Sequence, residues 1–186
     1  MINIVSGLPR SGTSLMMQML SAGGIPILSD GERVPDVDNP RGYCEWERIK
    51  QLPKEPGCID EAEGKAVKVI SQLLFALPAG HDYRIIFMER PLGEVVASQA
   101  EMIRRLGTVG APLPAAALIA GLKGHLSQVN AWLTQRSELE MLRLEYHAVL
   151  QEPAGAAQNV ATFLRRELNV EEMAKQVDPT LYRKRS

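Results

Sequence analysis

The sequence predicts a three-layer α/β/α fold with a central parallel sheet. Short apolar segments alternate with segments of helical periodicity along the chain, and the first apolar segment runs into a glycine-bounded turn followed by a helix. In such sheets ligands bind beyond the carboxyl ends of the strands. We therefore expect the loops after Ser6, Ile70, Met88 and Leu144 to surround one site.

The first half of the chain contains two predicted strands. Ile2–Ser6 is an apolar run, and Thr13–Ala22 has the apolar content of a helix. Ser29–Gly42 is rich in Asp, Asn, Gly and Pro, which predicts a loop. Glu45–Leu52 is predicted as a short helix that ends before a proline, and Ala66–Ile70 as the second strand.

The middle of the chain contains the clearest buried strand, Tyr83–Met88. A short helix is predicted before it at Ser71–Leu77. Pro91–Leu106 is predicted as a helix with proline in its first turn, where the missing N–H costs nothing. Gly107–Pro114 is a predicted loop rich in glycine and proline.

The last third of the chain is predicted to be mainly helical. Ala115–Arg136 is a long helix, Leu139–Leu144 is the last strand, and Ala154–Arg166 and Val170–Val177 are the final helices. The long helix is expected to bury one face, formed by residues at helical spacing: Leu118, Leu122, Leu126, Val129 and Leu133.

The composition is that of an ordinary globular protein. The 186 residues fit one domain spanning 1–186, with 45% hydrophobic and 23% charged residues. A net charge of -1 argues against a general binder of nucleic acid or of membrane surfaces. Cys44 and Cys58 form no CxxC pair, and neither a signal peptide nor an apolar run of about 18 residues is visible. A reduced, cytoplasmic protein is expected.

The segment Gly7–Ser14, GLPRSGTS, predicts a phosphate-binding loop. It has both glycines and the final hydroxyl of the nucleotide-triphosphatase pattern GxxxxGK[ST], but Thr13 stands at the lysine position. Backbone N–H groups of such a loop converge on an anion, and the helix that follows contributes roughly half a positive charge. The cation of this loop comes earlier, at Arg10, whose planar guanidinium can bind two oxygens of a phosphate or sulfuryl group.

The loop resembles that of the sulfotransferases that use 3'-phosphoadenosine 5'-phosphosulfate (PAPS), in particular the bacterial branch that reads PRSGT[ST]. The resemblance implies a P-loop NTPase-like sulfotransferase fold and PAPS as sulfuryl donor, with adenosine 3',5'-bisphosphate (PAP) as product. It assigns the 5'-phosphosulfate to the matching residues Pro9, Arg10, Ser11, Gly12, Thr13 and Ser14.

A second match is the segment Arg90–Ser98, RPLGEVVAS. In this family an arginine at a strand end and a serine eight residues later bind the 3'-phosphate, a spacing that Arg90 and Ser98 reproduce. Here proline directly follows the arginine, whereas the family usually has one residue between them.

Three further positions follow from the resemblance. Lys68 matches a strand-end lysine that neutralises the bridging oxygen as the sulfuryl group leaves. Tyr146 matches a tyrosine near the adenine, although a core or capping role suits it equally well. Arg183, in the basic C-terminal tail, matches a late basic segment that reaches the 3'-phosphate, and a disordered charged terminus is the alternative.

The proton acceptor is left open by the sequence. The cytosolic relatives place a histidine two residues after the lysine, where this chain has Ile70. Other branches use a glutamate, and Glu32 and Glu45 are the candidates by their distance from the loop and by the NPRGYCE segment. Each can also be a solvated surface charge. The three histidines are too widely spread for a metal site, and no metal is expected.

Three functions are compatible with these sequence features. The first is a sulfotransferase that moves a sulfuryl group from PAPS to the hydroxyl or amine of a small molecule, glycan or peptide. The second is a P-loop nucleotide kinase or NTPase, favoured by the apolar strand that ends in Glu89 and by Ser14 as a Mg²⁺ ligand. The third is a nucleotide-binding module without catalysis. Neither the acceptor nor the oligomeric state can be read from the sequence.

Overall fold

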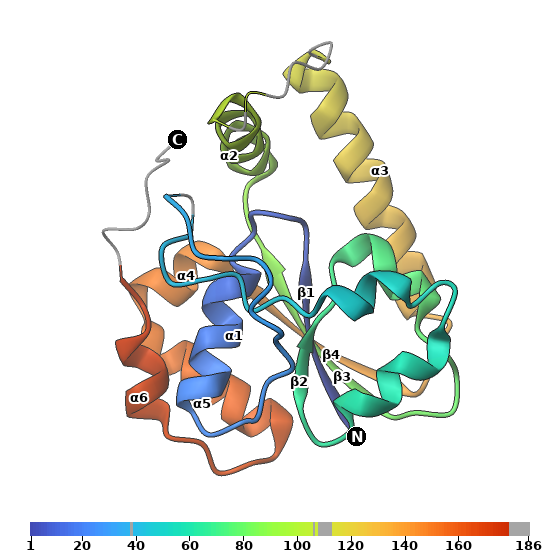
Figure 1. The fold of residues 1–186 in the computed structure, drawn as a ribbon, viewed down its shortest axis with the longest axis vertical. Helices are drawn as coiled ribbons and strands as arrows, with labels where there is room; N and C mark the ends of the chain where they lie inside the picture. The colour runs from blue at the N-terminus through green and yellow to red at the C-terminus, as the bar shows by residue number, and fades with distance from the viewer. Residues whose placement is uncertain (38, 106, 108–112, 179–186) are drawn as a thin grey trace.

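A computed structural model describes residues 1–37, 39–105, 107 and 113–178 (Figure 1). Its centre is a parallel sheet of β1 (Ile2–Gly7), β2 (Ala66–Lys68), β3 (Tyr83–Glu89) and β4 (Leu139–Glu145), in the order β2-β1-β3-β4. In register, Val5 lies beside Lys68 and Gly7 beside Met88. The carboxyl ends of all four strands therefore meet at one edge, as the sequence predicts.

Alternate residues of the strands face two separate cores, which makes the fold three-layered. On one face Ile4 and Ile85 pack with the 3₁₀ helices η1 (Glu47–Gln51), η2 (Pro56–Ala62) and η3 (Ser71–Ala76). The lower end of α3 (Ala115–Leu133) completes this layer. The α/β/α prediction is confirmed.

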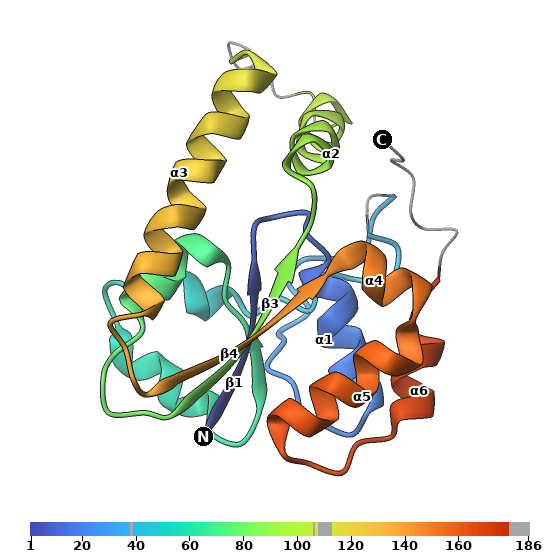
Figure 2. The ribbon, with the colours of Figure 1, turned by 180° about the vertical axis from the view of Figure 1, so that it is seen from behind.

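The other face of the sheet is covered by the first helix and the last ones. Val5, Ile86 and Met88 pack there with α1 (Thr13–Ala22), α5 (Pro153–Leu164) and α6 (Val170–Lys175). Figure 1 and Figure 2 show these helices together on one side of the strands. The methionines of α1 are fully buried in this core.

The long helix α3 corrects one prediction. Val129 is buried, but Leu118 is 37% exposed, so the predicted stripe is not buried along its whole length. The reason is geometric: the upper part of α3 extends past the carboxyl edge of the sheet, beside α2 (Leu92–Arg105), where no strand lies beneath it (Figure 1, Figure 2).

Other differences concern short elements. The predicted helices at 45–52 and 71–77 are 3₁₀ turns, and the second of the predicted strands pairs only as far as Lys68. The sequence did not predict η2 or α4 (Tyr146–Gln151), each too short to show a helical period. Most of the predicted loop 107–114 lies outside the described residues.

Within the described part of the chain, no helix has both the length and the apolar character that crossing a membrane requires.

Candidate functional site

The phosphate-binding loop joins β1 to α1 at the carboxyl edge of the sheet. Gly7 and Gly12 adopt φ angles of 146° and 102°, and Arg10 one of 75°, a region that favours glycine. Gly12 is the N-cap of α1, and no side chain caps this helix end. The first backbone N–H groups of α1 are thus left to bind water or an anion, and the helix dipole favours the anion.

Gly12 also lies against an aromatic ring from the other end of the chain. A Cβ atom at this position would lie 2.5 Å from Cδ2 of Tyr146, well inside van der Waals contact. The ring and the loop therefore fix each other, and only glycine fits between them.

We expect Gly12→Ala to destabilise the protein by about 3 kcal/mol, because about 1–2 kcal/mol of left-handed strain adds to the overpacking against Tyr146. Gly24→Ala is the matched control: its φ is 96°, but nothing lies within 4 Å of its added Cβ. It should cost about 1 kcal/mol, the strain alone. Urea unfolding of both variants measures the difference, and equal losses would contradict close packing at Gly12.

A cavity of about 220 Å³ opens above the loop. Its walls come from the loop, the segment 33–45, the end of β2, helix α2 and the start of α4. Six basic and three acidic side chains line it, an excess of positive charge, although the chain as a whole carries a net charge of -1. The lining therefore suits an anionic ligand. The basic residues are Arg10, Arg33, Arg41, Lys68, Arg90 and Arg105.

Arg90 and Ser98, which lie eight positions apart in the sequence, both line the cavity. Arg10 donates from Nε to the hydroxyl of Ser98, at 3.0 Å, and Arg90 donates from Nη1 to the carbonyl of Arg10, at 3.1 Å. The Arg90 guanidinium also lies 4.9 Å from the ring centroid of Tyr146. The loop, α2 and α4 thus bring two guanidinium groups and a hydroxyl together.

A second set of contacts in the cavity lining is organised around Lys68, at the end of β2. Its side chain is only 5% exposed, and its ammonium donates to Ser14 Oγ (3.0 Å), the Tyr43 carbonyl (2.7 Å) and Glu45 Oε1 (3.0 Å). Burial lowers the pKa of Lys68, and the nearby Glu45 carboxylate only partly opposes that shift. A positive charge from the end of β2 therefore lies beside Ser14. In the nucleotide-triphosphatase pattern the lysine that precedes the final hydroxyl supplies this charge, and here that position is Thr13.

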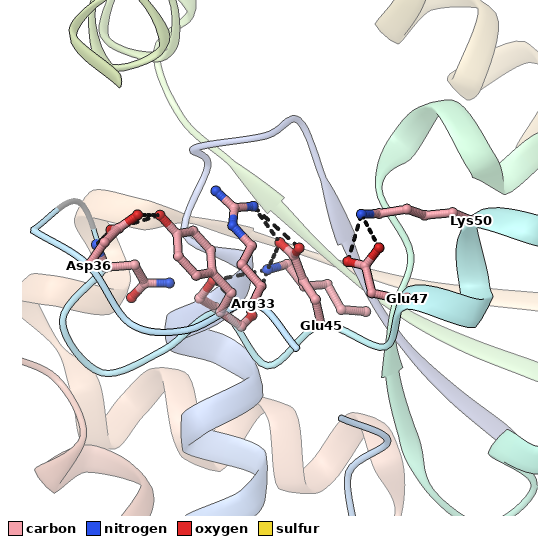
Figure 3. Close-up of polar contacts among 9 residues, drawn as sticks. Arg33, Asp36, Glu45, Glu47 and Lys50 are labelled. Atoms are coloured by element: carbon pink, nitrogen blue, oxygen red, sulfur yellow. Dashed lines mark hydrogen bonds and ion pairs between the residues drawn. The ribbon is translucent and has the colours of Figure 1, made fainter. Parts of the chain in front are cut away.

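Glu45 lies between two cations. Besides Lys68, Arg33 contacts Oε1 at 3.1 Å and Oε2 at 3.3 Å, as Figure 3 shows. Burial raises the pKa of Glu45, but the two cations outweigh it and hold this pKa below its usual value. Glu45 is therefore ionised at neutral pH, with an oxygen facing the cavity that Lys68 also lines.

The backbone around residue 44 explains this arrangement. Cys44 has a φ of 50°, and this kink lets the carbonyl of Tyr43 and the carboxylate of Glu45 reach the same ammonium. The Arg33 guanidinium stacks 3.4 Å from the ring centroid of Tyr43, whose hydroxyl donates to Asp36. Figure 3 shows Asp36, Arg33 and Glu45 along this segment.

Two of the described candidates from the sequence, Glu32 and Ser11, are not in the cavity lining. Glu32 is exposed and does not line the cavity, and its backbone N–H donates to Asp30. Arg183 lies outside the described residues. Ser11 is buried below the loop, where its hydroxyl has no hydrogen-bond partner in the structure. The other loop positions of the prediction, Pro9, Arg10, Gly12, Thr13 and Ser14, all line the cavity.

Sequence reasoning missed four residues that organise the site. Arg33 and Tyr43 come from the turn-rich loop, which has no periodicity to indicate which side chains point inward. Glu94 and His147 lie behind Arg90, with Glu94 Oε2 2.9 Å from Arg90 Nε. The i,i+4 spacing of Arg90 and Glu94 was the available signal. In the described residues, no group of three or more His, Cys, Asp or Glu side chains is placed to hold a metal ion.

No family model and no curated protein matches the sequence. Solved structures do match the fold. A sulfotransferase domain from the curacin biosynthetic pathway aligns with a TM-score of 0.55 and 16% identity, over 99% of this chain and 78% of that one. Mouse sulfotransferase SULT7A1 complexed with PAP aligns with a TM-score of 0.57 and 19% identity, over 96% of this chain.

A third match is retinol dehydratase in complex with androsterone and the inactive cofactor PAP, with a TM-score of 0.51, 16% identity and 95% of this chain covered. This chain spans 63% of the length of retinol dehydratase and 63% of that of the mouse enzyme. The chain therefore has the sulfotransferase fold.

Proposed function

We propose that the protein is a sulfotransferase that uses PAPS to sulfate a hydroxyl or amine of a small molecule, glycan or peptide. The observation that carries the proposal is that one cavity is lined by two separate sets of polar contacts with basic side chains. Arg10, Arg90 and Ser98 form one set, and Lys68 with Ser14 of the phosphate-binding loop forms the other. A nucleotide with phosphate groups at both its 3' and 5' positions matches such a pair of sites.

Different residues of the cavity would bind different parts of this donor. The loop N–H groups and Ser14 would hold the 5'-phosphosulfate, and Arg90 and Ser98 the 3'-phosphate. Because Arg10 donates to Ser98, we assign Arg10 to the 3'-phosphate as well, and not to the 5'-phosphosulfate that the resemblance gives it. Tyr146 is half-buried beside Arg90 and offers a ring face for the adenine. The donor supplies a sulfuryl group activated by its anhydride bond to phosphate.

Two residues are placed to assist the transfer. Glu45 accepts the acceptor's proton on Oε2, whose one described contact is the 3.3 Å contact with Arg33, while the acceptor oxygen or nitrogen forms its bond to sulfur. The bond from sulfur to the bridging oxygen breaks, and this oxygen keeps the electron pair. Lys68 neutralises the charge that develops there by turning to this oxygen one of its three N–H donors, which otherwise bind Ser14, the Tyr43 carbonyl and Glu45.

The kinase alternative gains no support from the described residues. Glu89, the acid expected to hold Mg²⁺, forms an ion pair with Arg143 and does not line the cavity. The hydroxyl of Ser14 donates to the Tyr43 carbonyl and accepts from Lys68. An ammonium, rather than a metal site, is therefore next to the last residue of the loop.

Calorimetry with adenosine 3',5'-bisphosphate and with Mg²⁺–ATP tests the proposal. We expect metal-independent binding of the bisphosphate and no binding of ATP, and the reverse result would reject sulfuryl transfer. Incubation with labelled PAPS and a panel of hydroxyl and amine acceptors then tests catalysis. If the bisphosphate binds but no acceptor is sulfated, the protein is a nucleotide-binding module without catalysis.

Arg90→Ala should weaken bisphosphate binding by at least about 1.5 kcal/mol, the low end for a hydrogen bond to a charged group. Arg104→Ala is the matched control, since Arg104 lies on α2, the helix that follows Arg90, but is 73% exposed and pairs with Glu101. Calorimetry with the bisphosphate measures both variants. An affinity unchanged by Arg90→Ala would remove Arg90 from the nucleotide site.

A further inference from the structure

A buried carboxylate contacts Arg90, one of the basic residues that line the cavity. Glu94, in the first turn of α2, is 3% exposed. Its Oε2 accepts from Arg90 Nε at 2.9 Å, and its Oε1 lies 3.1 Å from Nε2 of His147. Arg90 lines the cavity, whereas Glu94 does not. The carboxylate therefore contacts the cavity through the arginine.

Burying a carboxylate is costly unless it is paired and hydrogen-bonded. Three features of this chain compensate that cost for Glu94: the Arg90 guanidinium, the His147 ring and the amino end of α2, whose dipole favours a negative charge. All three hold the carboxylate in one place. An ion pair on the surface contributes little to stability and does not fix its side chains in this way.

The guanidinium of Arg90 is consequently fixed on several sides. Glu94 holds Nε, the carbonyl of Arg10 holds Nη1 at 3.1 Å, and the ring of Tyr146 lies 4.9 Å from Cζ. Because a guanidinium is planar and rigid, fixing Nε and Nη1 fixes the direction of the whole group. The ordering cost of this long side chain is then met by folding and not by ligand binding.

We propose that Glu94 is a positioning residue for the 3'-phosphate of the donor, acting through Arg90, with His147 holding Glu94 from behind. This inference rests on the proposed function, because the phosphate is the group that Arg90 is positioned to meet. It assigns a role in ligand binding to a residue that itself does not touch the ligand.

Two opposite effects on binding can be separated experimentally. A negative charge near a phosphate repels it, so removing the charge of Glu94 would tighten binding if repulsion were its main effect. If Glu94 positions Arg90, removing it weakens binding, because the guanidinium must then be ordered when the nucleotide arrives. The sign of the change therefore distinguishes the two effects.

The experiment is calorimetry of Glu94→Gln with adenosine 3',5'-bisphosphate and with adenosine 5'-monophosphate, which lacks the 3'-phosphate. We expect about tenfold weaker binding of the bisphosphate, equivalent to about 1.4 kcal/mol, and an unchanged affinity for the monophosphate. In an Arg90→Ala background, Glu94→Gln should have no further effect, because the two residues act as one unit.

The other outcomes overturn the inference in distinguishable ways. Equal or tighter bisphosphate binding by Glu94→Gln rejects positioning, and an equal loss for both nucleotides shows a structural role only. If the wild-type protein does not bind the bisphosphate, the proposed function itself fails. Should Glu94→Gln not fold, His147→Gln, at a half-exposed position, gives the same test and should weaken bisphosphate binding in the same direction.

Discussion

Replacing Lys68 by methionine is expected to lower kcat for sulfuryl transfer by about 100- to 1000-fold, the usual loss when one preorganised donor to a developing charge is removed. Methionine has a similar length and suits a buried position, but it donates no hydrogen bond. Affinity for the bisphosphate should change little, since Arg10, Arg90 and the loop remain. Steady-state kinetics with labelled PAPS, together with calorimetry, separates the two quantities.

The matched variant Lys68→Arg keeps the positive charge. It tests whether deprotonation of Lys68 causes the alkaline limb of the pH–rate profile. Burial lowers the pKa of Lys68 from 10.5, so the wild-type ammonium loses its proton, and the rate falls, as pH rises through this lowered value. Arginine stays protonated over the whole range. The alkaline limb of the wild-type profile should therefore lie below pH 10.5 and move upward in Lys68→Arg. An identical alkaline limb in both proteins would assign the titration to another group.

Glu45→Gln is expected to lower kcat by about 100-fold or more, because an amide cannot accept the acceptor's proton. The amide oxygen can still accept hydrogen bonds from Lys68 and Arg33, so the arrangement of the loop is kept. The pKa of Glu45 lies below 4.5, so the wild-type base stays ionised down to that pH and loses activity only as pH falls through the lowered value. A pH–rate profile and the kcat of the variant measure both effects.

Glu32→Gln is the control for this substitution. Glu32 is the other glutamate that the sequence offers, but it is exposed and outside the cavity lining, so its replacement should leave kcat unchanged. A large loss in Glu32→Gln with normal activity in Glu45→Gln would place the base at Glu32 instead.

The sheet and the conformation of the Gly7–Ser14 loop were predictable because their signals are local. Buried strands such as β3 are continuous apolar runs, and the glycines of the loop are required by backbone angles that other residues rarely adopt. The Arg90–Ser98 pair was predictable from a resemblance in spacing alone. Both its residues line the cavity.

The rest of the site depends on contacts between distant segments, for which the sequence carries no periodic signal. Glu45 lines the cavity and Glu32 does not, and this placement goes with the left-handed backbone of Cys44, an unusual conformation for a residue other than glycine. The burial of Glu94 was equally hidden, because an acid four residues after an arginine usually indicates an exposed helical pair. In the same way, the exposed end of α3 has the apolar sequence of a buried helix.

The Lys68 ammonium joins β2 to the phosphate-binding loop and to residues 43–45, and these contacts have a consequence for folding. Lys68 lies 54 residues from Ser14 in the chain, Arg10 lies 88 residues from Ser98, and Arg41 reaches the carbonyl of Gln176, 135 residues away. Contacts of such high sequence separation form late and slow a folding reaction, because the loops between them must close first. During synthesis, the glycine loop emerges among the first residues, yet it gains its neighbouring cations, Lys68 and Arg90, only when about half of the chain has followed. The nucleotide affinity that we propose would therefore be acquired only after β2 and β3 have joined β1, and no short fragment carrying the loop would possess it.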